Sequence, residues 1–212
     1  MTQLSSSGNE LIQMSEGAVI LKGFLLKHEQ ELLRNLERIT DLSAFRHMVT
    51  PGGYRMSVAM TNCGPRGWVT DERGYRYSET DPETGHAWPE MPALYSQLAR
   101  QAAAVAGYHD FCSDACLINR YIPGARLSLH QDKDEKNFTH PIVSFSLGLP
   151  ATFDFGGRTR SAPVTPYLLE HGDVVVWGGP SRMFYHGIRT LKKGHHERMG
   201  SQRINLTFRR AH

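Results

Sequence analysis

Two stretches of the chain repeat apolar residues with the period of an amphipathic helix. Within 27–41 the leucines and Ile39 fall on one helical stripe. A second stripe runs over 91–106, where Pro92 suits the first turn of a helix and Gly107 suits its end. The pattern therefore predicts two helices, both in the first half of the chain.

Beyond Gly107 the pattern changes to short apolar or alternating runs separated by turn residues. Alternation with a period of two, bounded by Gly, Pro, Asn and Asp, is typical of β-strands. Eight strands are predicted, at 115–121, 126–130, 141–149, 151–155, 167–169, 173–177, 183–186 and 203–209. So many short strands favour an α+β fold in which two N-terminal helices pack on a jelly roll, a double-stranded β-helix of antiparallel strands.

The remaining segments complete the expected organisation. Residues 17–21 are predicted as a short buried strand, whereas 1–16 are predicted as a disordered tail. Residues 44–88 are rich in glycine, aromatic residues and methionine without a helical period, which favours short hairpins and loops that form a lid. We expect one domain over 17–212, with the lid at 44–88 and the jelly-roll core at 114–210.

Composition narrows the class of protein. At 212 residues, with 40% hydrophobic and 21% charged residues, the chain has the make-up of an ordinary globular domain. No apolar run reaches the roughly 20 residues of a membrane span. The N-terminus has neither the basic nor the apolar region of a signal peptide. We therefore expect a cytoplasmic monomer that does not enter a membrane.

Cysteine usage agrees with a reducing compartment. The chain has three cysteines, an odd number that gives no pairing framework. Cys112 and Cys116 are close enough in sequence to act as zinc ligands, but no second C-x-x-C or H-x-H motif lies at a suitable spacing. Buried free thiols are the favoured interpretation.

Charge is unevenly distributed along the chain. The net charge is +3, yet residues 182–212 hold eight Lys and Arg against a single acid, Glu197, so this region carries +7 and the remainder −4. A basic C-terminal region is compatible with a phosphate-backbone partner. Charge alone favours the alternative, an ordinary solvated surface.

The pair His130 and Asp132, together with the distant His186, has the composition of a metal site. Side chains alternate faces along a strand, so residues 130 and 132 point the same way. Two histidines and one carboxylate occupy one face of an octahedral Fe(II) and leave the other positions open. A rival H-x-D motif, His171 and Asp173, lies in a turn before a buried strand. We expect Asp173 to bond its own turn backbone and His171 to lie on the surface.

The last predicted strand, 203–209, alternates strictly between apolar and polar residues. Ile204, Leu206 and Phe208 form one face, and Arg203, Asn205, Thr207 and Arg209 form the other. A solvated polar face is the commoner case, but on the inner face of a barrel two arginines need anionic partners. A dicarboxylate cosubstrate supplies them, because guanidinium binds carboxylate through a two-pronged fork. Asn119 and Tyr121, also two residues apart, are candidate additional ligands.

The combined motifs resemble the bacterial AlkB family. They are the segments 119–121, 129–134, 171–179, 185–187 and 203–209, and in the lid 48–54 and 56–64. The resemblance covers nearly all of 17–211. Only the N-terminal tail and residues 193–202 look unlike the pattern.

This resemblance implies a dioxygenase that uses Fe(II), O2 and 2-oxoglutarate to repair alkylated bases. His130, Asp132 and His186 would bind iron. Arg203 and Arg209 would each bind one end of 2-oxoglutarate, assisted by three further residues, Asn119, Tyr121 and Asn205. N-methyl groups of 1-methyladenine and 3-methylcytosine would leave as formaldehyde, with release of succinate and CO2.

The resemblance also implies a set of substrate contacts. A flipped methylated base is cationic, so an aromatic face and a carboxylate suit it. Trp68 would stack on the base opposite His130, and Asp134 would accept from its exocyclic amine. The other expected contacts to the damaged nucleotide are Met60, Tyr75, Arg76, Tyr77 and Arg160. The expected partner is single-stranded or double-stranded DNA that carries alkylated bases, with RNA as an alternative.

Two other function classes remain open. A 2-oxoglutarate hydroxylase of protein or small-molecule substrates would keep the iron and arginine sites but would not need the lid around Trp68 and Tyr77. A non-catalytic nucleic-acid binding module is disfavoured, because all three candidate iron ligands are present.

Overall fold

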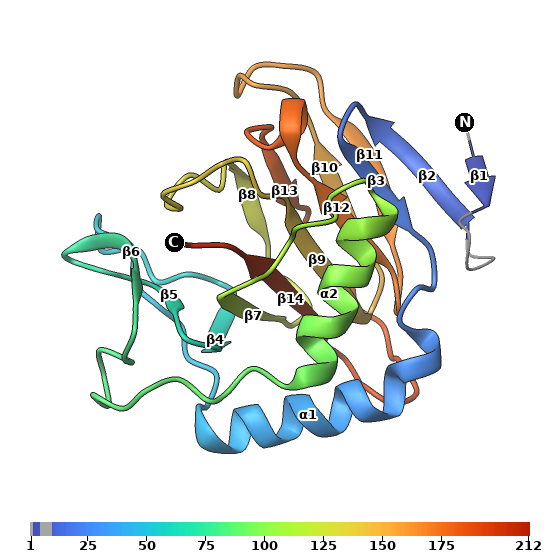
Figure 1. Ribbon diagram of the computed structural model, residues 1–212. Coiled ribbons are helices and arrows are strands. Elements are labelled where there is room, and N and C mark those ends of the chain that lie inside the picture. Colours follow the sequence, from blue (N-terminus) through green and yellow to red (C-terminus); the bar gives the residue numbers. More distant parts are fainter. Residues whose placement is uncertain (1, 5–9) are drawn as a thin grey trace.

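The computed structural model describes residues 2–4 and 10–212, and its regular structure is mainly β-strand (Figure 1). The strands of the larger sheet are β1 (Thr2–Leu4), β2 (Glu10–Ser15), β3 (Ala18–Leu21), β4 (Ala59–Cys63), β7 (Ala115–Tyr121), β9 (Ile142–Gly148), β12 (Val174–Trp177) and β14 (Arg203–Arg209). Those of the smaller sheet are β8 (Leu127–His130), β10 (Ala151–Phe155), β11 (Thr165–Leu169) and β13 (His186–Ile188). A separate hairpin consists of β5 (Gly67–Asp71) and β6 (Gly74–Ser78).

Strands distant in sequence are neighbours in both sheets. The larger sheet has the order β1-β2-β3-β12-β9-β14-β7-β4, and the smaller sheet has the order β11-β10-β13-β8. All the pairings within them are antiparallel. Two sheets of this kind with long crossovers form a jelly roll. The predicted fold class, an α+β double-stranded β-helix, is confirmed.

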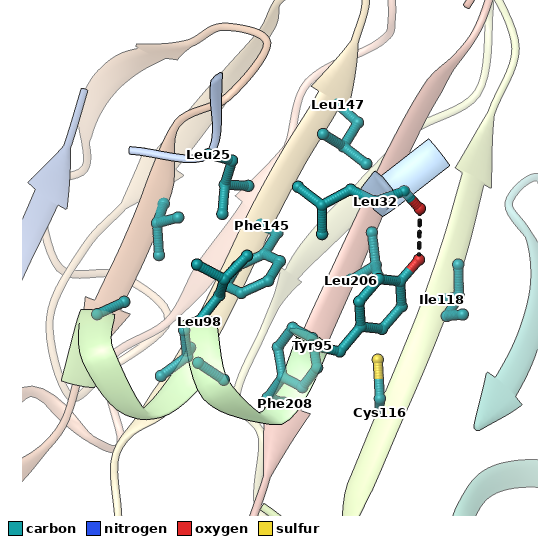
Figure 2. Close-up of a cluster of buried hydrophobic side chains, with 14 of the residues drawn as sticks. Leu25, Leu32, Tyr95, Leu98, Cys116, Ile118, Phe145, Leu147, Leu206 and Phe208 are labelled. Carbon is teal, nitrogen blue, oxygen red and sulfur yellow. Dashed lines mark hydrogen bonds between the residues drawn. The ribbon is translucent and has the colours of Figure 1, made fainter. Parts of the chain in front are cut away.

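Two helices cover the outer face of the larger sheet (Figure 1). They are α1 (Glu29–Leu42), which follows a 3-10 turn η1 (Leu26–His28), and α2 (Ala93–Val105). Figure 2 shows their contact, in which the Tyr95 hydroxyl donates a hydrogen bond of 3.0 Å to the Leu32 carbonyl among buried Leu, Phe and Cys side chains. Among the described residues, neither helix nor any other is long and apolar enough to cross a membrane.

Strand alternation places chemistry on the inner face of the larger sheet. In β14 the apolar residues Ile204, Leu206 and Phe208 belong to the core beneath the helices. Arg203 and Arg209 point the other way, toward the smaller sheet, and are nonetheless buried. A polar inner face backed by a closely packed apolar face gives a rigid platform for a site.

The structure corrects three details of the predicted organisation. The disordered tail at 1–16 is wrong for residues 2–4, which form β1 and pair with β2, and for residues 10–15, which form β2. Leu11, Ile12 and Met14 of β2 pack against the two cores. Residues 1 and 5–9 of that tail lie outside the described residues. The strand predicted at 183–186 begins only at His186, since the 3-10 turn η2 (Gly179–Ser181) continues into a turn closed by the Phe184 amide on the Ser181 carbonyl.

The third detail concerns the lid at 44–88. Its segment β4 is a buried strand of the larger sheet that pairs with β7. The hairpin of β5 and β6 projects beyond the sheets, next to β4 (Figure 1). The lid is therefore anchored through β4 on the strand that carries Asn119 and Tyr121.

Candidate active site

A cavity of about 680 Å³ lies between the two sheets and is also lined by Trp68 and Tyr75 of the β5–β6 hairpin. It is lined by the polar faces of β7 and β14, the ends of β8 and β13, and lid residues. All eight residues predicted to bind metal or 2-oxoglutarate line it, as do five of the seven predicted substrate contacts, namely Met60, Trp68, Tyr75, Asp134 and Arg160. Sequence motifs about 140 residues apart thus meet in one cavity.

The three candidate iron ligands form a compact cluster. His130 and His186 are direct partners in the pairing of β8 with β13, and their rings lie 4.4 Å apart. Nε2 of His130 is 3.6 Å from Oδ1 of Asp132, and Nε2 of His186 is 3.7 Å from Oδ2 of the same carboxylate. One ligand atom from each residue lies within 4.8 Å of the others. Such a donor set suits Fe(II) and leaves coordination positions open toward the cavity.

Both histidine rings are held by their other nitrogen. Nδ1 of His130 bonds the Ser128 carbonyl at 2.9 Å, and Nδ1 of His186 bonds the Phe184 carbonyl at 3.0 Å. A carbonyl only accepts, so each Nδ1 carries the proton and each Nε2 is left with a lone pair for a metal. This is the tautomer that a metal ligand requires.

The electrostatics of the cluster keep Asp132 ionised and His186 neutral. Burial by itself would raise the pKa of Asp132, but the positive charge of Arg209 and the neighbouring imidazoles hold that pKa well below its usual range. Burial and the adjacent His130 lower the pKa of His186 to about 4. An anionic carboxylate and a neutral imidazole are the protonation states in which these groups bind a cation.

Arg203 carries the evidence for an anionic ligand. The residue is 1% exposed. Its Nη2 donates to the Ser146 hydroxyl at 3.1 Å, and its guanidinium lies 5.2 Å over the Tyr121 ring. Nε and Nη1 have no hydrogen-bond partner among the described residues. A buried cation with two unused donors in a cavity wall suits a carboxylate.

The other predicted 2-oxoglutarate residues surround Arg203 on the inner face. Asn205 pairs with Asn119 across the strands, and Nδ2 of Asn119 donates to Oδ1 of Asn205 at 3.3 Å. Oδ1 of Asn119 is buried without a partner among the described residues. Arg209, at the far end of β14, donates to Oδ2 of Asp132 at 2.7 Å. The two arginines thus border opposite parts of the same cavity, as a dicarboxylate requires.

The lid presents an aromatic wall to the cavity mouth. Trp68 and Tyr75, from β5 and β6, stack with ring centroids 5.7 Å apart. Nε1 of Trp68 donates to Oδ2 of Asp134 at 2.7 Å, so the carboxylate expected to bind the base also orients the ring expected to stack on it. Arg160, exposed on the opposite side, lies 5.3 Å over the Tyr185 ring.

Two predicted substrate contacts do not reach the cavity wall. Arg76 forms a double ion pair with Asp71 across the turn of the hairpin, at 2.6 and 2.7 Å. The Tyr77 hydroxyl donates to Glu135 at 2.5 Å, behind the site. Alternation explains Arg76, which lies on the opposite face of β6 from the cavity-lining Tyr75. Tyr77 shares the face of Tyr75, but its hydroxyl is bound to Glu135 and it does not line the cavity.

Sequence reasoning missed several residues of the site. Ser144, Thr207 and the exposed Tyr54 line the cavity, and Glu135 and Arg182 form a buried ion pair of 2.8 Å beside it. The alternation of Ser144 and Ser146 with apolar residues in β9 was the available signal for the serines. The pairing of Glu135 with Arg182 left no signal in the sequence.

Among the residues that the structure describes, the rival motif His171 and Asp173 belongs to no group that could hold a metal ion. The Asp173 carboxylate accepts from the Glu170 amide at 2.8 Å and from the Gly23 amide at 2.9 Å, which confirms its role in the turn. The expected surface position of His171 is wrong. Its side chain is only 11% exposed, and its Nδ1 accepts a hydrogen bond of 2.9 Å from the Gly148 amide.

Comparison with known proteins agrees with this site. Residues 17–209 match the family model described as the 2OG-Fe(II) oxygenase superfamily. The chain is 58% identical to the alpha-ketoglutarate-dependent dioxygenase AlkB of Escherichia coli over 93% of this chain and 92% of that protein.

More distant relatives are similar over most of this chain. The DNA N(6)-methyladenine demethylase ALKBH1C of Arabidopsis thaliana is 32% identical over 91% of this chain and 48% of its own length. The solved structure of OsALKBH1 superposes with a TM-score of 0.84 at 30% identity and covers 94% of this chain and 99% of that one.

Proposed function

The chain belongs to the 2OG-Fe(II) oxygenase superfamily, and we propose that it removes methyl groups from 1-methyladenine and 3-methylcytosine in DNA. It is a dioxygenase whose cofactors are Fe(II) and 2-oxoglutarate. The observation that carries the proposal is the guanidinium of Arg203, whose Nε and Nη1 have no hydrogen-bond partner among the described residues, in the same cavity as the His130, Asp132 and His186 cluster. An anion-binding donor and an open metal site in one cavity suit a metal-bound dicarboxylate cosubstrate.

The protein residues supply placement. His130, Asp132 and His186 would hold iron, and Arg203 and Arg209 would bind the two ends of 2-oxoglutarate, with Asn119, Tyr121 and Asn205 beside them. When bound, iron and 2-oxoglutarate supply the oxidising chemistry: O2 is consumed, 2-oxoglutarate becomes succinate and CO2, and the N-methyl carbon gains a hydroxyl group. The hydroxymethyl group then leaves the nitrogen as formaldehyde, which restores the base.

The aromatic lid supports a nucleic-acid substrate. A methylated adenine or cytosine of this kind is cationic and has a blocked pairing edge, so extrusion from a duplex costs less than for an intact base. Trp68 and Tyr75 offer a stacking face at the cavity mouth, and Asp134 offers an acceptor beside it. The similarity to the DNA N(6)-methyladenine demethylase of Arabidopsis thaliana supports the same class of substrate. Single-stranded or locally opened DNA is the proposed main substrate, with RNA as a second one.

Oligomeric state and compartment are part of the proposal. The cavity is lined by residues of one chain, so a monomer suffices. Cys63 and Cys116 are buried free thiols and Cys112 is an exposed one, which suits a reducing cytoplasm. Size-exclusion chromatography with light scattering tests the first statement.

The test is formaldehyde release from a 1-methyladenine oligonucleotide in the presence of Fe(II), O2 and 2-oxoglutarate. His130→Ala and Asp132→Ala are expected to abolish release while the circular dichroism spectrum stays that of the wild type. His195→Ala, a change at an exposed histidine outside the cavity, is the matched control and should release formaldehyde normally. Full activity of either ligand variant would contradict the metal assignment.

A 2-oxoglutarate hydroxylase of protein or small-molecule substrates is the second candidate. It predicts no preference of the protein for a methylated oligonucleotide, so a binding assay with methylated and unmodified strands separates the two. A binding module without catalysis predicts no uptake of Fe(II) in an anaerobic titration.

A further inference from the structure

Glu135 is a buried carboxylate directly behind the candidate metal site. The residue is 6% exposed and does not line the cavity. Its Oε1 accepts a hydrogen bond of 2.5 Å from the Tyr77 hydroxyl and lies 3.3 Å from Nε of Arg209. Its Oε2 accepts a hydrogen bond of 2.8 Å from Nη2 of Arg182. One carboxylate therefore joins the lid, the loop after η2 and the last strand.

Both arginines that contact Glu135 also contact Asp132. Nη1 of Arg182 donates to the backbone carbonyl of Asp132 at 2.8 Å, and Nη2 of Arg209 donates to its carboxylate at 2.7 Å. The candidate iron ligand is thus held by two guanidinium groups, one on its backbone and one on its side chain. Glu135 is the acidic group that those two arginines share.

Charge makes this arrangement interdependent. Arg182 and Arg209 contribute two buried positive charges, and Asp132 and Glu135 contribute two negative ones. Breaking a buried ion pair by removing one member leaves an uncompensated charge, which is strongly unfavourable. Without the Glu135 carboxylate, Arg182 loses its acidic partner and Arg209 has only Asp132, a group that must also serve a metal ion.

We propose that Glu135 is a positioning residue, which fixes the metal ligand Asp132 and the cosubstrate-binding Arg209 through a shared network of buried ion pairs. Tyr77 joins the lid to this network. The inference rests on the proposed function, because that function assigns Asp132 to iron and Arg209 to 2-oxoglutarate. Groups that orient metal ligands in this way govern metal affinity as well as activity.

Glu135→Gln is the informative change. Glutamine keeps the shape but has a single acceptor oxygen and no charge, so it cannot accept from Arg182 and Tyr77 at two separate oxygens. At the place of the second oxygen, the NH2 group of the glutamine would face a donor, either the N–H of Arg182 or the O–H of Tyr77. Asp132 and Arg209 are then expected to lose their fixed orientation although neither is altered.

The experiment measures binding of Mn²⁺, and then of 2-oxoglutarate to the Mn²⁺-loaded protein, by calorimetry without O2. Loss of a supporting group behind a metal ligand weakens metal binding by about 10- to 100-fold, and Glu135→Gln is expected to fall in that range. The matched control is Asp173→Asn, the same change at a carboxylate that is 1% exposed and paired with Lys22 outside the cavity. It is expected to bind both ligands as the wild type does, even where it lowers the unfolding midpoint.

Equal Mn²⁺ affinity in the wild type and Glu135→Gln would overturn the inference and leave the proposed function standing. Failure of the wild type itself to bind Mn²⁺ would overturn both. If Glu135→Gln does not fold, Glu135→Asp decides, because a carboxylate one methylene shorter cannot reach both arginines and should still weaken Mn²⁺ binding. Unchanged binding in that variant would also overturn the inference.

Discussion

Arg203 brings a positive charge into the interior without an acidic partner among the described residues. Its contacts are a serine hydroxyl and the Tyr121 ring. Burial lowers the pKa of Arg203, which is the direction expected when the charged form is disfavoured. The free-energy cost of burying this charge favours tight anion binding, because an incoming carboxylate removes that cost and forms charge-assisted hydrogen bonds with the guanidinium.

This reasoning predicts opposite effects of Arg203→Met on stability and on cosubstrate binding. Methionine removes the uncompensated charge, so the unfolding midpoint without 2-oxoglutarate should equal or exceed that of the wild type. The KM for 2-oxoglutarate should rise by about tenfold or more, since a hydrogen bond to a charged group contributes about 1.5–3 kcal/mol. Thermal melts and initial rates of succinate formation check both. A destabilised variant with unchanged KM would contradict the assignment of Arg203.

Individual site residues differed in how far the sequence could reveal them. Asn119 and Tyr121 lie two apart in β7, and Asp132 follows His130 by two residues just beyond the end of β8, so the period of two indicated each pair, and the family resemblance joined them to His186. Glu135 and Arg182 are 47 residues apart and meet only through the tertiary fold. The resemblance identified the segment of Arg76 and Tyr77 but not which of its side chains line the cavity.

At the scale of elements, the β5–β6 hairpin is the part of the lid that we propose contacts the substrate. The ion pair between Asp71 and Arg76 stabilises its turn, and Trp68 stacks on Tyr75. Trp68 also donates a hydrogen bond to Asp134 in the loop after β8. The aromatic face is therefore oriented before a base arrives. Such preorganisation lowers the entropic cost of binding.

Trp68→Ala is expected to affect nucleic acid more than cosubstrate. Loss of a cation–π contact of about 0.5–2 kcal/mol weakens binding of a 1-methyladenine oligonucleotide by roughly 2- to 30-fold. The metal and 2-oxoglutarate residues lie on other strands, so succinate formation without nucleic acid should stay near the wild-type rate. Fluorescence anisotropy and the uncoupled assay measure the two effects. Equal losses in both would indicate that Trp68 supports the fold instead.

The bounds of a strand could be predicted where both of its faces are packed, because packing then fixes the pattern of apolar and polar residues along it. β7, β10 and β14 have the predicted bounds, because apolar and polar residues alternate in β10 and β14 and β7 begins with an unbroken apolar run. β2 was missed since half of its sequence, ELIQMS, is polar and none of its residues is fully buried, and pairing with β3 rather than its own pattern makes it a strand. β13 was placed too early because Met183 and Phe184 are apolar residues of a turn.

At the scale of the whole molecule, residues 193–202 link helix α1 to the turn before β12. His196 stacks on His171 with ring centroids 4.4 Å apart. Nε2 of His171 lies 3.2 Å from Oε1 of Glu29 at the start of α1, and Nε of Arg198 lies 3.3 Å from the other oxygen. This cluster joins three segments remote from the cavity, so it bears on global stability rather than on catalysis.

The histidine cluster predicts that the protein loses stability between pH 7 and pH 5. Burial and the neighbouring His196 lower the pKa of His171, with Arg198 adding to the effect and Glu29 and Asp173 opposing it. A histidine whose folded pKa lies below its unfolded value near 6.5 stabilises the fold fully above that pH, and the contribution is lost as the pH falls toward the folded pKa. His171→Asn keeps an acceptor for the Gly148 amide but does not titrate, so its urea midpoint should fall less over this range. Parallel declines in the wild type and the variant would assign the acid sensitivity to other groups.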